Sequence, residues 1–214
     1  MRSSTAQPGE RQRDSEKVRA TQILNAASAL LAEAGSDGFT AAAVARRAGV
    51  NKALIFYYWG SVADLFERVL QGYYDSHRAA LETALSVAGT KRERVHRLLD
   101  TYVDFMQDNR AYVRIVQHQI AGGGPYAAVV QRHYAEITQW ALSQLEPLVP
   151  SSGATSPRHL HFSISAVVVN YFTYAPGLAE AWGHDPLTPG ALAERRAHVH
   201  WLVDACLDSL ERGG

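Results

Sequence analysis

Hydrophobic positions recur at intervals of three and four along most of the chain, the spacing that places them on one face of an α-helix. In the N-terminal part this pattern predicts helices over residues 15–34, 40–48 and 52–58. Further apolar stretches predict helices over residues 61–87, 91–108, 110–121, 125–148, 157–182 and 190–212. No alternating strand pattern competes with these helices, so the expected fold class is all-α.

Residues 40–60 have the pattern of two short helices joined by a sharp turn. Thr40 and Asn51 can each accept a hydrogen bond from a free amide in the first turn of a helix. Gly49 suits the left-handed backbone that ends the first helix. Small apolar residues that let the two helices pack closely are Val44, Ala45, Ala48, Val50 and Ile55. The spacing predicts a helix-turn-helix that inserts its second helix into the DNA major groove, and the alternative is an ordinary helical corner.

The side chains expected to contact DNA lie on these two helices. They are Thr40, Arg46, Asn51, Lys52, Ala53, Leu54, Tyr57 and Tyr58. We expect Lys52 to bind a phosphate and Asn51 and Tyr57 to lie nearer the base edges. The net charge of the chain is zero, but residues 1–60 contain eight Lys or Arg against five Asp or Glu. The basic end of the chain is therefore the end with the helix-turn-helix.

This region resembles the N-terminal domain of tetracycline-repressor (TetR) family transcription regulators. The resemblance covers about residues 17–70 and rests on Phe39-Thr40, Val44-Ala45, Ala48-Gly49-Val50, Lys52, Ile55, Phe56-Tyr57-Tyr58-Trp59-Gly60-Ser61 and Asp64-Leu65-Phe66. Phe56 replaces a common tyrosine, Trp59 a common phenylalanine, and Val62 a lysine that often reaches a phosphate. No DNA contact is therefore expected from Phe56 or Val62. The resemblance implies a ligand-responsive homodimer, most often a repressor, that binds a palindromic operator.

Three segments are expected along the chain. Residues 1–14 form a disordered basic tail, residues 15–60 a helix-turn-helix DNA-binding domain, and residues 61–214 a helical regulatory and dimerisation domain. The charge of the tail comes from Arg2, Arg11 and Arg13. These arginines suit either a solvated segment or an arm that follows DNA. Ser61 and Asp64 are spaced to cap the helix that begins the third segment.

The last two predicted helices have unusually broad apolar surfaces. Residues 160–178 are apolar almost all round, so this helix must be buried on more than one side. A monomeric core is one explanation. The TetR resemblance favours a homodimer, because members of that family dimerise through their last two long helices. The residues expected in the interface are Phe162, Ala166, Val169, Trp201, Leu202, Ala205 and Leu207.

The central helices carry a set of aromatic, apolar and amide side chains suited to a small-molecule site. They are Tyr102, Phe105, Met106, Gln117, Tyr134, Trp140, Asn170 and Tyr174. A mostly apolar wall with a few polar groups is typical of such sites. The expected effector is a small apolar or aromatic molecule, and the alternative for each residue is an ordinary place in the core.

The sequence contains no motif that indicates catalysis, a cofactor or a metal. The glycines at 122–124 are followed by Pro125 rather than by the Lys-Ser/Thr of a phosphate loop. Histidines two residues apart point in different directions on a helix and cannot share a metal ion; these pairs are His159 with His161 and His198 with His200. The single Cys206 excludes an intramolecular disulfide.

A cytoplasmic, non-enzymatic regulator is therefore expected, because no signal-like or membrane-spanning apolar run appears in the sequence. Its expected partners are double-stranded operator DNA, a small-molecule effector and a second copy of the chain. The alternative function is a helical small-molecule carrier or enzyme in which the helix-turn-helix has only a structural role.

Overall fold

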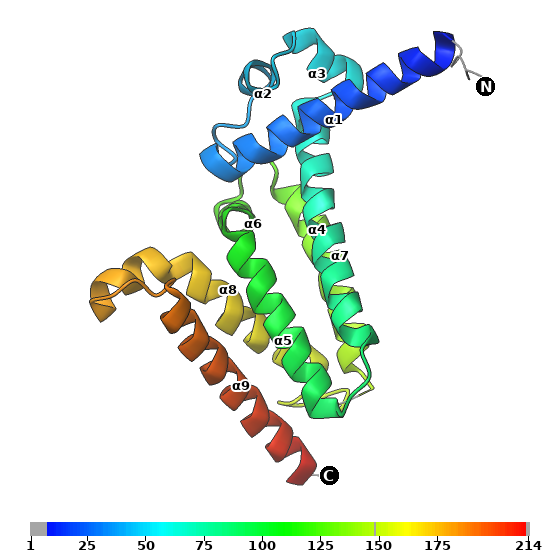
Figure 1. The fold of residues 1–214 in the computed structure, drawn as a ribbon. Coiled ribbons are helices and arrows are strands. Elements are labelled where there is room, and N and C mark those ends of the chain that lie inside the picture. Colours follow the sequence, from blue (N-terminus) through cyan, green and yellow to red (C-terminus); the bar gives the residue numbers. More distant parts are fainter. Residues whose placement is uncertain (1–7, 148, 213–214) are drawn as a thin grey trace, which may run out of the picture. The chain divides into compact units, whose positions relative to one another are not determined.

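The computed structural model of the chain describes residues 8–147 and 149–212, and all regular secondary structure in these residues is helical. The helices are α1 (Pro8–Ala34), α2 (Ala41–Ala48), α3 (Lys52–Trp59), α4 (Val62–Ser86), α5 (Lys91–Asp108), α6 (Arg110–Gly122), α7 (Ala127–Leu145), α8 (Pro157–Trp182) and α9 (Pro189–Arg212) (Figure 1). The predicted all-α fold class is confirmed. The chain divides into two compact units, Met1–Gly72 and Tyr73–Gly214.

Two expected boundaries differ from those in the structure. The first helix begins at Pro8, so residues 8–14 are helical rather than disordered; proline suits the first helical turn, and Glu, Arg and Gln are good helix formers. Arg2 and the side chain of Arg11 lie outside the described part of the chain. The two units meet inside α4, at Gly72, rather than after residue 60, because the first turns of α4 belong to the core of the first unit.

The core of the first unit is built from one face of α1, the two short helices and the start of α4. Its fully or almost fully buried side chains are Ile23, Ala27, Leu31, Phe39, Val44, Ala45, Ala48, Ile55, Leu65, Phe66 and Leu70. The rings of Phe39 and Phe66 meet edge to face with centroids 5.6 Å apart. Each ring therefore helps to fix α4 on the loop before α2.

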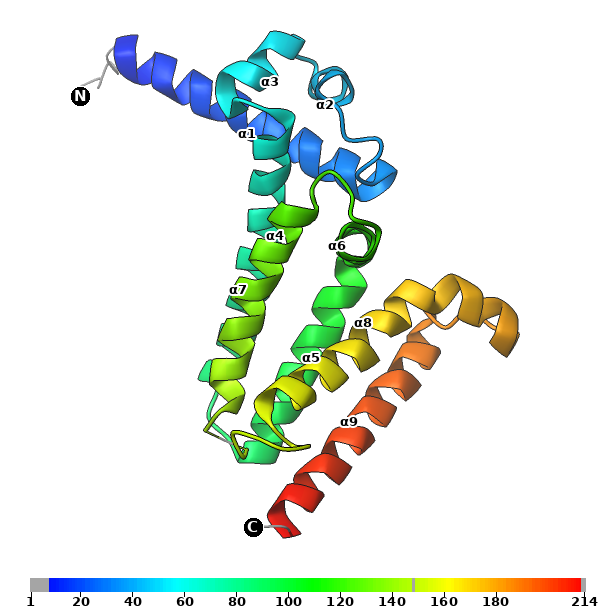
Figure 2. The same ribbon diagram turned by 180° about the vertical axis from the view of Figure 1, so that it is seen from behind.

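The core of the second unit lies between α5, α6, α8 and α9; α9 runs alongside α5, and α8 crosses α5 in Figures 1 and 2. Its buried residues are Leu99, Val103, Met106, Val113, Val168, Tyr171, Phe172, Leu192, Val199, Val203 and Leu207.

Leu207 was expected in a dimer interface. It is instead buried in the core of its own chain, because it lies four residues after Val203 on the face of α9 that packs on α5.

Charged groups line the edge where α5 packs on α9, and we call this arrangement the α5–α9 seam. The guanidinium of Arg196 contacts the carboxylates of Asp100, at 2.8 Å, and Asp104. The rings of His96 and His200 stack with their centroids 4.2 Å apart. The same edge also holds Arg92, Asp204 and Asp208, with Arg92 at 2.5 Å from both carboxylates.

Candidate nucleic-acid interface and effector site

The two short helices begin and end as their sequence predicts. Thr40 Oγ1 accepts a hydrogen bond from the Ala43 amide at 3.2 Å, and Asn51 Oδ1 accepts one from the Ala53 amide at 2.9 Å. Gly49 has a φ of 64°, the left-handed conformation in which a side chain would be strained. Its amide turns back toward the last carbonyls of α2. The predicted helix-turn-helix between residues 40 and 59 is confirmed.

Contacts from α1 hold this turn in place, and sequence reasoning missed them. The side-chain amide of Gln22 donates to the carbonyl of Ala48 at 2.8 Å, which satisfies a carbonyl at the end of α2. Arg47 binds the carboxylate of Glu33 through both guanidinium nitrogens, at 2.5 and 2.7 Å. The hydrogen bond from Arg47 holds the pKa of Glu33 below its ordinary value. No local spacing links these pairs, since each joins residues of different helices.

One face of α3 is packed and the other is open to solvent. Ile55 is fully buried, whereas Asn51, Lys52, Ala53 and Tyr57 are exposed. Among the other residues expected on DNA, Thr40 and Arg46 are exposed and Leu54 and Tyr58 are half-buried. All eight therefore lie on the accessible side of the two helices or at its edge. Their contact with DNA stays a prediction.

Phe56 is a surface residue that the sequence reasoning set aside. Its ring is 43% exposed, and the ammonium of Lys52 lies 5.9 Å from the ring centroid. The neighbouring rings of Tyr57 and Tyr58 meet edge to face at 5.0 Å. The open face of α3 therefore combines one cation with three aromatic rings. The available signal was the spacing of four residues between Lys52 and Phe56 on one helix, but an aromatic residue at helical spacing is equally typical of a core.

The structure brings together only some of the residues expected to line an effector site. Gln117 Nε2 donates to Asn170 Oδ1 at 3.2 Å, but Asn170 is exposed. Tyr174 is 63% exposed on α8 and does not face an interior wall. Trp140 packs beneath the guanidinium of Arg78, 5.7 Å from its ring centroid. Periodicity alone did not distinguish the inner from the outer face of α8, because both faces are apolar.

Tyr102, Phe105 and Met106 do lie together, in a group of rings around the second half of α4. We call this group the aromatic cluster; it comprises Tyr73, Tyr74 and His77 of α4, Tyr102 and Phe105 of α5, Tyr112 of α6 and His133 of α7. Tyr73 stacks on Tyr112 at 4.6 Å and donates from its hydroxyl to the sulfur of Met106 at 3.7 Å.

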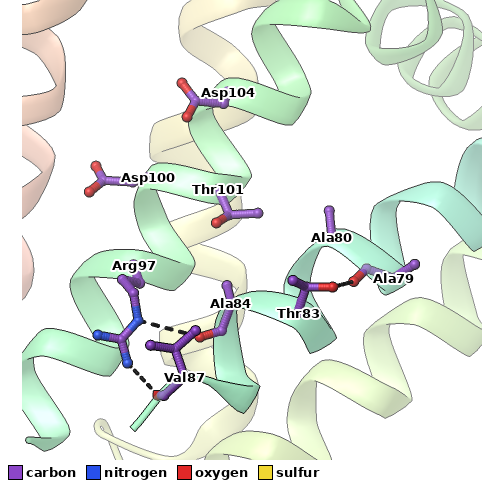
Figure 3. Close-up of a pocket in the computed structure, with 9 residues that line it drawn as sticks. All are labelled: Ala79, Ala80, Thr83, Ala84, Val87, Arg97, Asp100, Thr101 and Asp104. Carbon is purple, nitrogen blue, oxygen red and sulfur yellow. Dashed lines mark hydrogen bonds between the residues drawn. The ribbon is translucent and has the colours of Figure 1, made fainter. Parts of the chain in front are cut away.

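An open groove of about 570 Å³ lies between the end of α4 and α5 (Figure 3). Its lining consists of Ala79, Ala80, Thr83, Ala84, Val87, Arg97, Asp100, Thr101 and Asp104. None of the residues expected to bind an effector lines it. Arg97 donates to the carbonyls of Ala84 and Val87, which cap the end of α4, and both aspartates bind Arg196. The charged groups of the groove therefore already have protein partners.

The described residues contain neither a candidate metal-binding cluster nor a helix that could span a membrane. Among residues 8–147 and 149–212, no three or more His, Cys, Asp or Glu side chains are placed to hold a metal ion. In the same part of the chain, no helix has the length and apolar content needed to cross a lipid bilayer.

The geometry of α2 and α3 defines a protein of the helix-turn-helix class. Residues 23–69 match the model of the family described as bacterial regulatory proteins, tetR family. The chain is 27% identical over 114 residues to the HTH-type transcriptional activator FasR of Mycolicibacterium smegmatis, covering 53% of this chain and 52% of FasR. It is 32% identical over 84 residues to the HTH-type transcriptional regulator BetI of Rhizobium meliloti, covering 39% of this chain and 41% of BetI.

The fold has relatives among solved structures. A TetR transcription regulator from Haloarcula marismortui superposes with a TM-score of 0.65 at 17% identity, covering 88% of this chain and 98% of that one. The likeness at this identity concerns the fold. The chain spans about half the length of the curated relatives it matches. Residues 23–69 therefore match the DNA-binding part of that family, and the fold is similar to that of a solved TetR regulator.

Proposed function

We propose that this protein is a homodimeric transcription regulator that binds a palindromic DNA operator through α3 and releases it when a small effector binds the second unit. The observation that carries the proposal is the open face of α3. Its cap, its single buried anchor Ile55 and its turn glycine are those of a recognition helix, while Lys52 and Tyr57 remain free to contact DNA. Acting on DNA would place the protein in the cytoplasm.

The proposed DNA contacts fall into two groups, those with phosphates and those with base edges. Lys52 and Tyr58, with Thr40 at the N-terminus of α2, would bind phosphates and set the position of the helix. Asn51, Ala53, Leu54 and Tyr57 would face base edges, and Arg46 would add charge beside the groove. Because one recognition helix reads only half of a palindrome, the proposal also requires two copies of the chain.

The proposed interface between the copies is the outer surface of α8 and α9. Phe162 and Trp201 are 66% and 63% exposed, and Ala205 and Cys206 are exposed beside Trp201 on α9. Ala166, Val169 and Leu202 are half-buried at its edges. Large exposed apolar side chains on these two helices favour a protein partner. A symmetric pair of α8 and α9 helices would bury them against a second copy of the same surface.

The proposed coupling runs through α4. This helix begins beside the recognition helix and continues from the first unit into the second, since the units divide at Gly72 within it. An effector that binds more tightly to one of two conformations of α4 would favour that conformation and change the separation of the two α3 helices in the dimer. For operator binding this separation must match about one DNA turn, roughly 34–36 Å. The coupling is expected to be about 1–3 kcal/mol. Repression is the proposed sign, although the relative FasR is named an activator.

A gel-shift titration tests DNA binding. The full chain is titrated into the DNA upstream of its own gene, with and without an excess of random-sequence competitor. Specific binding is expected to survive the competitor and to protect two half-sites about one helical turn apart. Equal affinity for both DNAs, or no binding to either, would favour the alternative of a helical carrier with a structural helix-turn-helix.

A further inference from the structure

Two polar atoms on α4 are buried without a hydrogen-bond partner in the described protein. They are the hydroxyl of Tyr74 and Nε2 of His77, whose residues are 7% and 6% exposed. The two residues lie three positions apart and therefore share one face of the helix. Buried polar atoms are usually paired because an unpaired one costs free energy, so two on one helix face call for an explanation.

Flat rings surround both atoms. The ring of His133 lies nearly parallel to that of Tyr74 at 5.6 Å. The rings of Tyr102 and Phe105 lie nearly parallel to that of His77, at 5.2 and 4.6 Å. The surroundings of Tyr74 and His77 are therefore mostly aromatic with a few polar atoms, a composition typical of sites for apolar or ring-shaped molecules, and the unpaired atoms would fix the orientation of such a molecule.

Both polar groups are held in their uncharged forms. Burial lowers the pKa of His77 to about 4, so its imidazole is neutral near pH 7. Burial, with a smaller contribution from Tyr134, raises the pKa of Tyr74, so its phenol keeps its proton. A neutral imidazole and a phenol can each donate or accept a hydrogen bond. Neither offers the opposite charge that an ionised ligand would need in a buried site.

A neighbouring helix supplies a third buried polar atom. Thr138 Oγ1 of α7 is also buried without a partner in the described protein. Tyr134 precedes it by one helical turn and is 36% exposed. Tyr134 contributes to the raised pKa of Tyr74, after burial, which indicates that the two phenols are near one another. α7 therefore carries a third unpaired polar atom one helical turn from the partly exposed Tyr134.

We propose that Tyr74 Oη and His77 Nε2 are the hydrogen-bonding groups of the effector site, and that the effector is an uncharged ring compound carrying a hydroxyl or carbonyl oxygen. This inference rests on the proposed function, because it names the chemistry of the effector of that regulator. The hydrogen-bonding groups of the effector site are then on α4. They are not Gln117 and Asn170, which were expected there but bind each other. Tyr74 and His77 lie on α4, the helix that is proposed to couple effector binding to the separation of the two α3 helices.

Calorimetric titration of the full chain without DNA tests the chemical class. The probes are naphthalene, β-naphthol, methyl β-naphthyl ketone and β-naphthoate, which share one ring system and differ in polarity and charge. The alcohol and the ketone are expected to bind more tightly than naphthalene, and the carboxylate more weakly than either. Binding of the carboxylate at least as tightly as the alcohol would overturn the neutral class, and no binding by any uncharged probe would overturn the site.

Matched substitutions test the residues. Tyr74→Phe and His77→Phe are each expected to weaken β-naphthol by up to about tenfold, the value of one hydrogen bond, with naphthalene almost unchanged. Ser156→Ala is the control, because Ser156 Oγ is also buried without a partner in the described protein but lies in the loop before α8. Wild-type affinity for β-naphthol in both α4 variants would overturn the assignment.

Ligand-free stability separates an effector site from a site filled by structural water. Tyr74→Phe is expected to leave the denaturation midpoint unchanged or to raise it. Tyr171→Phe is expected to lower the midpoint, because the hydroxyl of Tyr171 donates to the carbonyl of Pro186 at 2.6 Å. Equal losses in the two variants would show that Tyr74 already has a structural partner and would overturn the proposal. Gel shifts without probes identify failure of the proposed function separately, since this inference can fail while operator binding remains.

Discussion

The two units of this protein reach a helical fold by different means. In the first unit, local sequence signals determine the geometry: Thr40 and Asn51 cap their helices, Gly49 makes the turn, and Ile55 anchors α3. In the second unit the helices are equally regular, but long-range contacts determine what each face does. Examples are the aromatic cluster and the α5–α9 seam, whose members lie far apart in the sequence. A short motif can therefore reveal the first function, whereas the effector site depends on how the helices pack.

The largest expected effect compares the two faces of α3. Ile55→Asp places a charge at a fully buried position and should lower the free energy of unfolding by about 3–5 kcal/mol. Tyr57→Asp changes a 69% exposed side chain on the same helix and should leave the stability within about 0.5 kcal/mol. Urea denaturation followed by circular dichroism measures both. Similar losses in the two variants would contradict the division of α3 into an anchored face and a free face.

A second large effect is expected on assembly rather than on folding. Ala205→Glu puts a charge on the exposed side of α9, opposite its own symmetry mate in the proposed dimer, at a cost of several kcal/mol, roughly 3–5. Analytical ultracentrifugation should show a folded monomer with weakened operator binding. Arg94→Ala, an exposed change on α5, is the control and should stay dimeric. A wild-type chain that is monomeric at micromolar concentration would contradict the proposed interface.

His77 of the aromatic cluster should make stability depend on pH. Burial lowers the pKa of His77 from 6.5 to about 4, and the groups in ring contact with it are Tyr73, Tyr102 and Phe105. Between these two pKa values the unfolded chain binds a proton that the folded protein excludes. The free energy of unfolding therefore falls as the pH falls, by about 2–3 kcal/mol from about pH 7 to about pH 4.5.

His77→Phe removes this contribution while keeping a ring at the position. Urea denaturation of both proteins across that pH range isolates it, because the remaining titratable groups are shared. The wild type should lose about 2–3 kcal/mol more than the variant. Parallel pH profiles would show that His77 is solvated rather than buried.

A smaller effect is expected at the α5–α9 seam. Arg196→Ala removes the contacts with Asp100 and Asp104 and leaves like charges on neighbouring turns of α5, so the free energy of unfolding should fall by about 1 kcal/mol. Glu82→Ala breaks a more exposed pair with Arg78 while keeping the Arg78 guanidinium over Trp140, and it should cost about 0.5 kcal/mol or less. Denaturation at low and high salt measures both losses, and salt should reduce the difference. A larger loss for Glu82→Ala would contradict this ranking.

The sequence was sufficient for features whose causes lie within a few residues. The helix over residues 91–108 was predicted with the observed bounds, and the capping residues Thr40 and Asn51 were identified correctly. Residues 8–14 looked like part of a tail because they have no apolar period, yet they form the first turns of α1. Periodicity reports where a side chain could be buried, whereas actual burial depends on the neighbouring helix.

The effector site shows the limit of that reasoning most clearly. Tyr73, Tyr74 and His77 lie on one helix, and their ring partners come from α5, α6 and α7. Apolar spacing cannot show that two polar atoms among these rings lack a partner. Leu207 was expected in a dimer interface and is buried in the core, whereas Tyr174 was expected to line the effector site and is exposed. Three-dimensional packing was needed to distinguish them.

The central claim, that α3 binds DNA, is tested most directly by the salt dependence of Lys52→Ala. Fluorescence anisotropy gives the operator affinity of wild type, Lys52→Ala and the control Arg94→Ala over a range of salt concentrations. If Lys52 binds a phosphate, its loss should reduce the slope of log affinity against log salt by about one unit and weaken specific and nonspecific DNA alike. Arg94→Ala should keep the wild-type slope. An unchanged slope in correctly folded Lys52→Ala would contradict the account of α3 as the DNA-binding helix.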